Sequence, residues 1–126
     1  MLTCVRPLST NESSEVGAAY GNFERQFTFE DDNLNTISEN YVYQFNSENE
    51  AIAAKTTLDA SIKSDEKTKV TTEINVNQLK KISVTSGGNV DGYLKSLSEF
   101  SSITNFDLNS LMSAENQTGL SCSTIE

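Results

Sequence analysis

Two cysteines near the ends of the chain, Cys4 and Cys122, carry its most informative chemistry. A bond between them would close almost the whole chain, and the loop-entropy model gives such a closure about 4–5 kcal/mol of stability. Because structural disulfides persist in oxidising compartments, the pair predicts a periplasmic or extracellular protein whose leader has been removed. Two alternatives stay open: reduced cysteines buried as small hydrophobes in a cytosolic protein, and a lipid anchor on Cys4.

The sequence contains no histidine. Ser–His–Asp and Cys–His catalysis and most zinc sites are therefore not expected. If both cysteines are bridged, thiolate chemistry is also excluded. Gly87 and Gly88 lack the lysine and the third glycine of a phosphate-binding loop. These features predict a protein that is not an enzyme and that uses no cofactor and no metal.

Carboxylates are the remaining candidates for acid–base chemistry. Four of them lie on or beside predicted strands: Glu24, Glu30, Glu39 and Glu73. A pair of carboxylates can hydrolyse a glycosidic bond without histidine. Strand carboxylates are usually solvated, however, and the chain has no tryptophan on which a sugar could stack. We therefore interpret these four residues as solvent-exposed carboxylates without a catalytic role.

Alternating apolar and polar residues predict two β-hairpins, Phe23–Glu30 with Ile37–Phe45 and Val70–Val76 with Leu79–Thr85. The segment 31–35, Asp-Asp-Asn-Leu-Asn, has the composition of a turn. It resembles a calcium loop only in part, because the glycine and glutamate that such a loop needs are replaced by Thr36 and Val42.

Arg25 shares a strand face with phenylalanines in the first hairpin. We expect a structural role for it, either stacked on an aromatic ring or paired with a carboxylate near the edge of the sheet.

Three helices are predicted. Ser47 and Glu50 have capping-box spacing and predict a helix over about 48–64. A second helix begins at Asn89 or Asp91. Its apolar side holds Tyr93, Leu94, Leu97, Phe100 and Ile103. A short third helix follows a cap within 104–107 and contains Leu108, Leu111 and Met112.

The order hairpin, helix, hairpin, helix predicts one α+β domain over residues 1–126. We expect an antiparallel sheet of about four to five strands with two or three helices on one face. Residues 1–21 contain Pro7 and a polar run, and are predicted to be an irregular lead-in with room for one short strand or turn.

The chain carries 18 acidic and 9 basic residues, a formal net charge of −9. Such a charge repels nucleic acid and speeds encounter with cationic partners, although it also serves solubility alone. No apolar stretch approaches the roughly 18 residues of a membrane span.

With catalysis set aside, binding by surface remains. The leading hypothesis is an exported protein, a monomer or small homodimer, that binds a cationic protein partner. An inhibitor or immunity protein that neutralises a secreted hydrolase, for example a cell-wall-degrading type VI effector, fits this class-level profile. The alternatives are a structural or adhesive cell-surface or lipoprotein module, and a domain that binds a ligand on the exposed sheet face. The candidate partner-binding residues lie in two loops: Glu30, Asp31, Asp32, Asn33, Asn35, Asn89 and Asp91.

Overall fold

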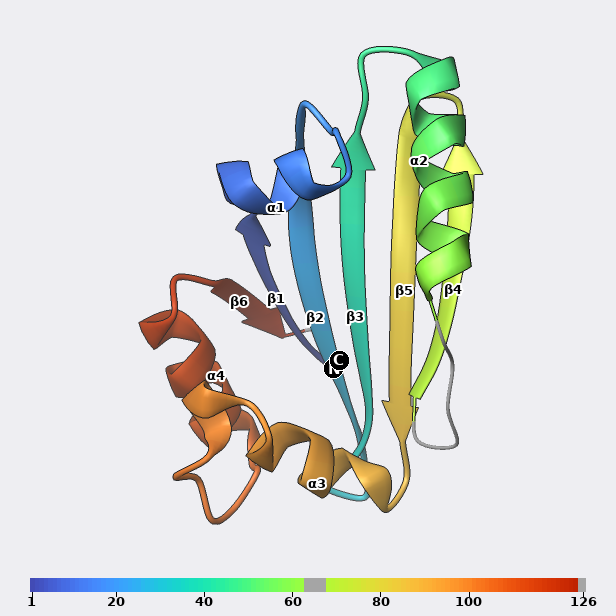
Figure 1. Cartoon of the computed structure of the whole chain (residues 1–126). Coiled ribbons are helices and arrows are strands. Elements are labelled where there is room, and N and C mark those ends of the chain that lie inside the picture. The colour runs from blue at the N-terminus through green and yellow to red at the C-terminus, as the bar shows by residue number, and fades with distance from the viewer. Residues whose placement is uncertain (63–67, 125–126) are drawn as a thin grey trace.

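The protein folds as a six-stranded antiparallel sheet whose one face is covered by helices (Figure 1). The computed structural model describes residues 1–62 and 68–124. The elements in chain order are β1 (Leu2–Pro7), α1 (Thr10–Glu15), β2 (Tyr20–Glu30), β3 (Asn33–Gln44), α2 (Glu48–Ser61), β4 (Thr68–Asn75), β5 (Gln78–Ser86), α3 (Asn89–Lys95), the 3₁₀ turn η1 (Ser98–Phe100), α4 (Leu108–Gln117) and β6 (Ser121–Thr124). The α+β class and the single helical face are as predicted, with one strand more than the upper expectation.

Both predicted hairpins are present. In the first, Asp31 and Asp32 form a two-residue turn with φ angles of 52° and 66°. Two-residue hairpin turns favour left-handed residues, and aspartate tolerates that conformation. The turn predicted from these acidic residues is therefore confirmed, at its tightest length.

Residues 1–21 are more regular than the predicted lead-in, because they contain the short strand β1, for which the prediction left room, and the helix α1, which it did not include. Residues of β1 pair antiparallel with β2 on one side and with β6 on the other. Helix α1 begins at a complete capping box made by Ser9 and Glu12. The strand order is β4-β5-β3-β2-β1-β6, so β1 lies inside the sheet although Pro7 ends it.

The predicted disulfide is present between Cys4 and Cys122. The two residues face each other in the β1–β6 register. The bond therefore fixes the last strand of the chain to the first.

The helices differ from expectation at their ends. Ser47 caps α2 as predicted, through a 3.2 Å hydrogen bond from the Glu50 amide. The described helix ends at Ser61, and the predicted end at residue 64 lies outside the described residues.

The second predicted helix is interrupted. Gly88, rather than Asn89 or Asp91, occupies the N-cap of α3, and no side chain caps it. Leu97 has an extended backbone, with a ψ angle of 133°, and this non-helical residue separates α3 from η1. For α4, Asp107 is the cap, within the segment proposed for it.

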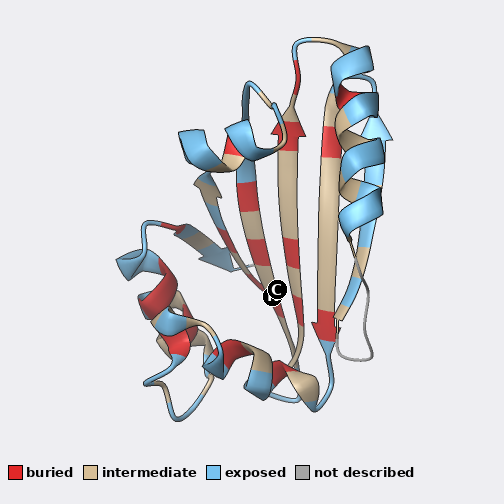
Figure 2. Cartoon of the chain, viewed as in Figure 1, coloured by how far each residue is buried: buried red, intermediate tan, exposed pale blue. Residues whose placement is uncertain are grey.

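Two apolar clusters lie between the sheet and its helices. Figure 2 shows in red the buried positions along the strands and helices. The larger joins β1, β2 and β3 to α3 and α4, and the smaller lies under α2. The larger cluster contains Leu2, Cys4, Phe23, Phe27, Ile37, Val90, Leu94, Phe100, Leu111, Ala114 and Leu120. The smaller contains Tyr43, Phe45, Ala51 and Leu79. Among the described helices, none combines the length and the apolar character that crossing a membrane requires.

Candidate functional site

The acidic end of the molecule is formed by the β2–β3 turn, the β5–α3 connection and the segment 104–107. These three segments surround a cavity of about 370 Å³. Its charged lining residues are Asp32, Asp91, Lys95 and Asp107. The two loops predicted to bind a partner therefore meet at one place.

Local hydrogen bonds hold the acidic end together. The amide of Gly87 donates to the carbonyl oxygen of Asn35 at 2.9 Å, which ties the β5–α3 connection to the first hairpin. Asp107 accepts from the amide of Ser110 at 2.8 Å and so caps α4. That hydrogen bond lowers the pKa of Asp107, which keeps its carboxylate charged.

The structure brings some of the predicted binding residues together and separates others. Asp32, Asn33 and Asp91 line the cavity. Glu30, Asp31 and Asn35 belong to the same hairpin end but are not part of the lining. Asn89 faces a neighbouring hollow beside Tyr93.

Sequence reasoning missed Lys95 and Asp107 as members of this site. Asp107 was identified only as a possible helix cap, and an acidic cap is a local signal. Its position beside the same cavity as Asp32 depends on how α4 returns to the sheet, which no local pattern specifies.

The chemistry of the acidic end suits a cation. Asp32, Asp91 and Asp107 are exposed, and Lys95 is the one basic residue among the described residues of the lining. Carboxylates placed around a cavity form charge-assisted hydrogen bonds with a lysine or arginine side chain. Within residues 1–62 and 68–124, no group of three or more potential metal ligands is positioned to hold an ion.

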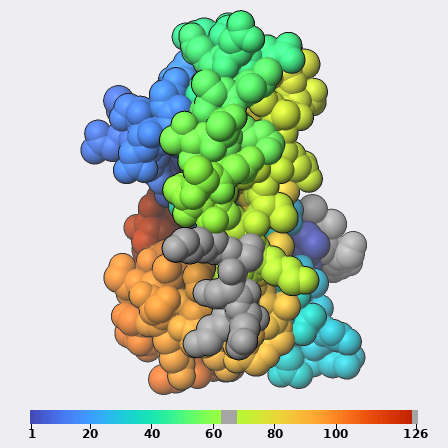
Figure 3. All heavy atoms as spheres, turned by 45° about the vertical axis from the view of Figure 1, so that its right-hand side comes forward, coloured from blue at the N-terminus to red at the C-terminus, as the bar shows by residue number. Residues whose placement is uncertain are grey.

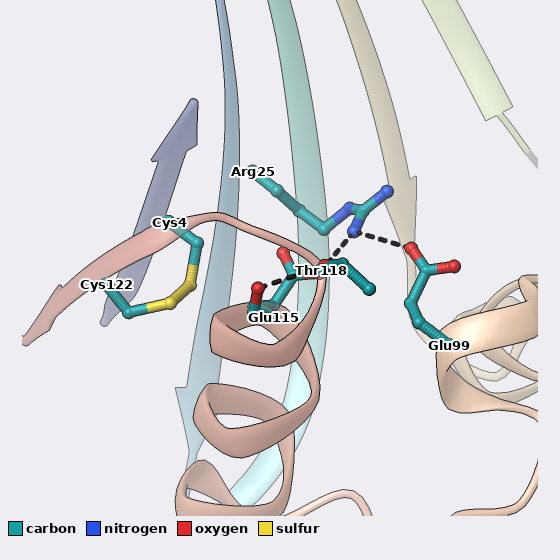
Figure 4. The surroundings of a disulfide bond; sticks show 6 residues. All are labelled: Cys4, Arg25, Glu99, Glu115, Thr118 and Cys122. Carbon is teal, nitrogen blue, oxygen red and sulfur yellow. Dashed lines mark hydrogen bonds and ion pairs between the residues drawn. A yellow bond between two sulfur atoms is a disulfide. The ribbon is translucent and has the colours of Figure 1, made fainter. Parts of the chain in front are cut away.

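A second group of charges is buried between the sheet and the C-terminal helices. Arg25 on β2 donates to Glu39 on β3 at 2.9 Å and to Glu115 on α4 at 2.7 Å. Its Nη1 atom lies 3.4 Å from Glu99. Figure 4 shows the guanidinium between Glu115 and Glu99, near the disulfide.

The surroundings of Arg25 agree with the structural role predicted for it. The guanidinium also lies over the rings of Phe23 and Phe100, at 5.1 and 5.6 Å from their centres. Both expected contacts, stacking and pairing, are present. The expected place is wrong, because β2 is an interior strand and Arg25 is 6% exposed.

Glu115 is the most perturbed acid of this cluster. It is fully buried, and its Oε2 atom has no hydrogen-bond partner among the described residues. Burial raises its pKa to about 7, since Arg25 offsets the penalty only in part and Glu99 adds repulsion. Tyr93 donates to Glu39, and burial together with that carboxylate raises the pKa of Tyr93.

The Arg25 cluster therefore joins β2 and β3 to α3, η1 and α4. None of Arg25, Glu39 and Glu115 lines the cavity at the acidic end or the neighbouring hollow beside Tyr93. Its geometry is that of an internal ion-pair network. Sequence reasoning placed Glu39 among the surface carboxylates, but Glu39 shares the helix-covered face because it pairs across the strands with Arg25.

No family model, curated protein or solved structure matches this chain significantly. The function therefore has to be inferred from the chemistry of its own residues.

Proposed function

We propose that this protein is an exported, non-enzymatic domain that binds a cationic protein partner through its acidic end. An inhibitor or immunity protein that neutralises a basic secreted hydrolase, such as a cell-wall-degrading effector, is the most specific form of the proposal. The observation that carries it is the meeting of Asp32, Asp91 and Asp107 around one open cavity.

The disulfide supports the exported part of the proposal. A bond that joins Cys4 to Cys122 contributes to stability only where it stays oxidised, as in the periplasm or outside the cell. The acidic end is rigid before a partner binds, because a backbone hydrogen bond joins the first hairpin to the β5–α3 connection. Rigid loops lose little conformational entropy on binding.

The overall charge supports the cationic partner. A net charge of −9 accelerates the approach of a basic protein, and the carboxylates of the acidic end then supply local contacts. Basic enzymes are common among those that attack anionic cell walls, because charge helps them reach their substrate.

A structural or adhesive module remains the second candidate. It is favoured by β4, which borders the sheet, and by exposed apolar residues at the β4–β5 end. Ile74 and Val76 are 37% and 64% exposed. A module of this kind would assemble through its sheet edge into polymers, whereas a binder of the proposed kind stays a monomer or small dimer.

Affinity capture from a periplasmic or secreted fraction tests the proposal. The disulfide-intact chain is immobilised beside two charge-matched variants, Asp32→Asn/Asp91→Asn at the acidic end and Glu48→Gln/Glu73→Gln elsewhere. Asparagine tolerates the left-handed backbone of position 32, and Asp91 and Glu48 each lie in the first turn of a helix.

We expect mass spectrometry to identify a basic hydrolase that binds the wild-type chain and the control variant but not the acidic-end variant. Equal retention by all three proteins would contradict the assigned site. Retention only as self-assembled polymer would favour the structural module.

A further inference from the structure

Helices α1 and α2 lie at the opposite end of the sheet from the acidic end (Figure 1). Residues at the C-terminal end of α1 and on one side of α2 line a groove there. Its volume is about 550 Å³, within the range of about 300–1,000 Å³ that is typical of ligand pockets. Phe45, Val16, Ala54 and Leu58 provide apolar lining. Figure 3 shows α2 in green beside α1 in blue at the upper end of the molecule.

The sequence explains why the groove is open. On α2, the side next to α1 carries small residues, including Ala53, Ala54 and Ser61, so the helix does not fill the space beside it. Gly17 follows Val16, the C-cap of α1, with a φ of 76°, and it lines the groove where the chain turns away from the helix. The hydroxyl of Thr57 donates to the carbonyl of Ala53, and that of Ser61 to the carbonyl of Leu58.

Two carboxylates stand at the groove, Glu15 on α1 and Glu50 on α2. Neither forms an ion pair within the part of the chain that the structure describes. None of the described lining residues is basic. The groove therefore has an apolar floor with two carboxylates at its border. Such a groove complements an apolar side chain that has positively charged residues beside it.

We propose that this groove is a second binding site, which takes a large apolar side chain flanked by lysine or arginine on a protein segment. The apolar side chain lies against Phe45 and Leu58, and the flanking cations pair with Glu15 and Glu50. This site is separate from the acidic end, and the proposal does not depend on the function proposed above.

The test uses the peptide acetyl-KKWKK-amide as the probe. Because the chain contains no tryptophan, the fluorescence of the peptide reports its own surroundings without interference. We expect saturable binding with a blue shift of the tryptophan emission, as its ring leaves water. The peptide acetyl-EEWEE-amide should neither bind nor shift.

Matched variants locate the site. Ala53→Phe fills the groove, and we expect it to weaken binding by about tenfold or more, since the ring loses its apolar contact. Ala60→Phe should leave binding unchanged, because Ala60 is exposed on the same helix but lies outside the groove. Glu50→Gln should weaken binding by about two- to fivefold. Glu48→Gln, in the same helical turn, should not.

The proposal would be overturned by equal binding of the peptide to wild type and Ala53→Phe, by binding without a blue shift, or by equal binding of the acidic peptide. Loss of binding in Asp32→Asn/Asp91→Asn, with Ala53→Phe unaffected, would assign the peptide to the acidic end. That outcome would overturn the groove site and leave the acidic-end proposal intact.

Discussion

Cys4 and Cys122 lie directly opposite each other on β1 and β6, with Cα atoms 4.0 Å apart, although 118 positions separate them in the chain. Their bond removes the entropy of a very long loop from the unfolded chain. We expect Cys4→Ser/Cys122→Ser to lower the free energy of unfolding by about 2–5 kcal/mol, measured by urea denaturation. A wild-type protein treated with reductant should match the variant.

Titration with a thiol reagent gives an independent check on this bond. The denatured, unreduced protein should contain no free thiol, because both cysteines are bridged. Two reactive thiols would contradict both the bond and the oxidising compartment inferred from it.

Arg25 and Arg6 provide a matched comparison of buried and exposed ion pairs. Both guanidiniums lie over the Phe23 ring, at 5.1 and 4.8 Å from its centre. Arg25→Met leaves the buried carboxylates without their counter-ion, so we expect a loss of about 3–5 kcal/mol. Arg6→Met breaks a pair with Glu12 whose side chains are each 27% exposed, and should cost about 1 kcal/mol or less. Equal losses in urea denaturation would contradict the network described around Arg25.

Glu115 predicts an unusual pH dependence. In the unfolded chain it has its ordinary pKa of 4.5, whereas in the folded protein the pKa is about 7. Between these two pH values the folded state binds more protons than the unfolded state. The contribution of Glu115 to the free energy of unfolding is therefore complete below pH 4.5 and is lost as the pH rises through about 7.

The free energy of unfolding of Glu115→Gln should vary less with pH over this range than that of the wild type. Glutamine preserves an oxygen that can accept from Arg25 while removing the titration. Parallel pH profiles for the two proteins would contradict the raised pKa.

The sequence predicted elements whose signals are local. The alternation around Phe27 and the cap at Ser47 depend on neighbouring residues, and both elements formed as expected. The capping box of Ser9 and Glu12 is a local signal of the same kind, although the polar composition around it predicts irregular structure.

Elements that depend on distant pairing could not be predicted in this way. β1 is short and ends at Pro7, and it becomes a strand because β2 and β6 supply partners on both sides. The same limit applies to the sites. No local pattern in the helix that contains Glu115 predicts its pairing with Arg25, which lies 90 positions earlier in the chain. Asp107 and Asp32 line the same cavity only because the helices return to the end of the first hairpin.

The association rate of the captured partner tests the central claim most directly. It is measured by stopped flow from low to physiological salt, for the wild type and for Asp32→Asn/Asp91→Asn. If the acidic end guides a cationic partner, the wild-type rate should fall by about tenfold or more with added salt, and the variant should start slower and fall less. Identical, salt-independent rates for the two proteins would contradict the account.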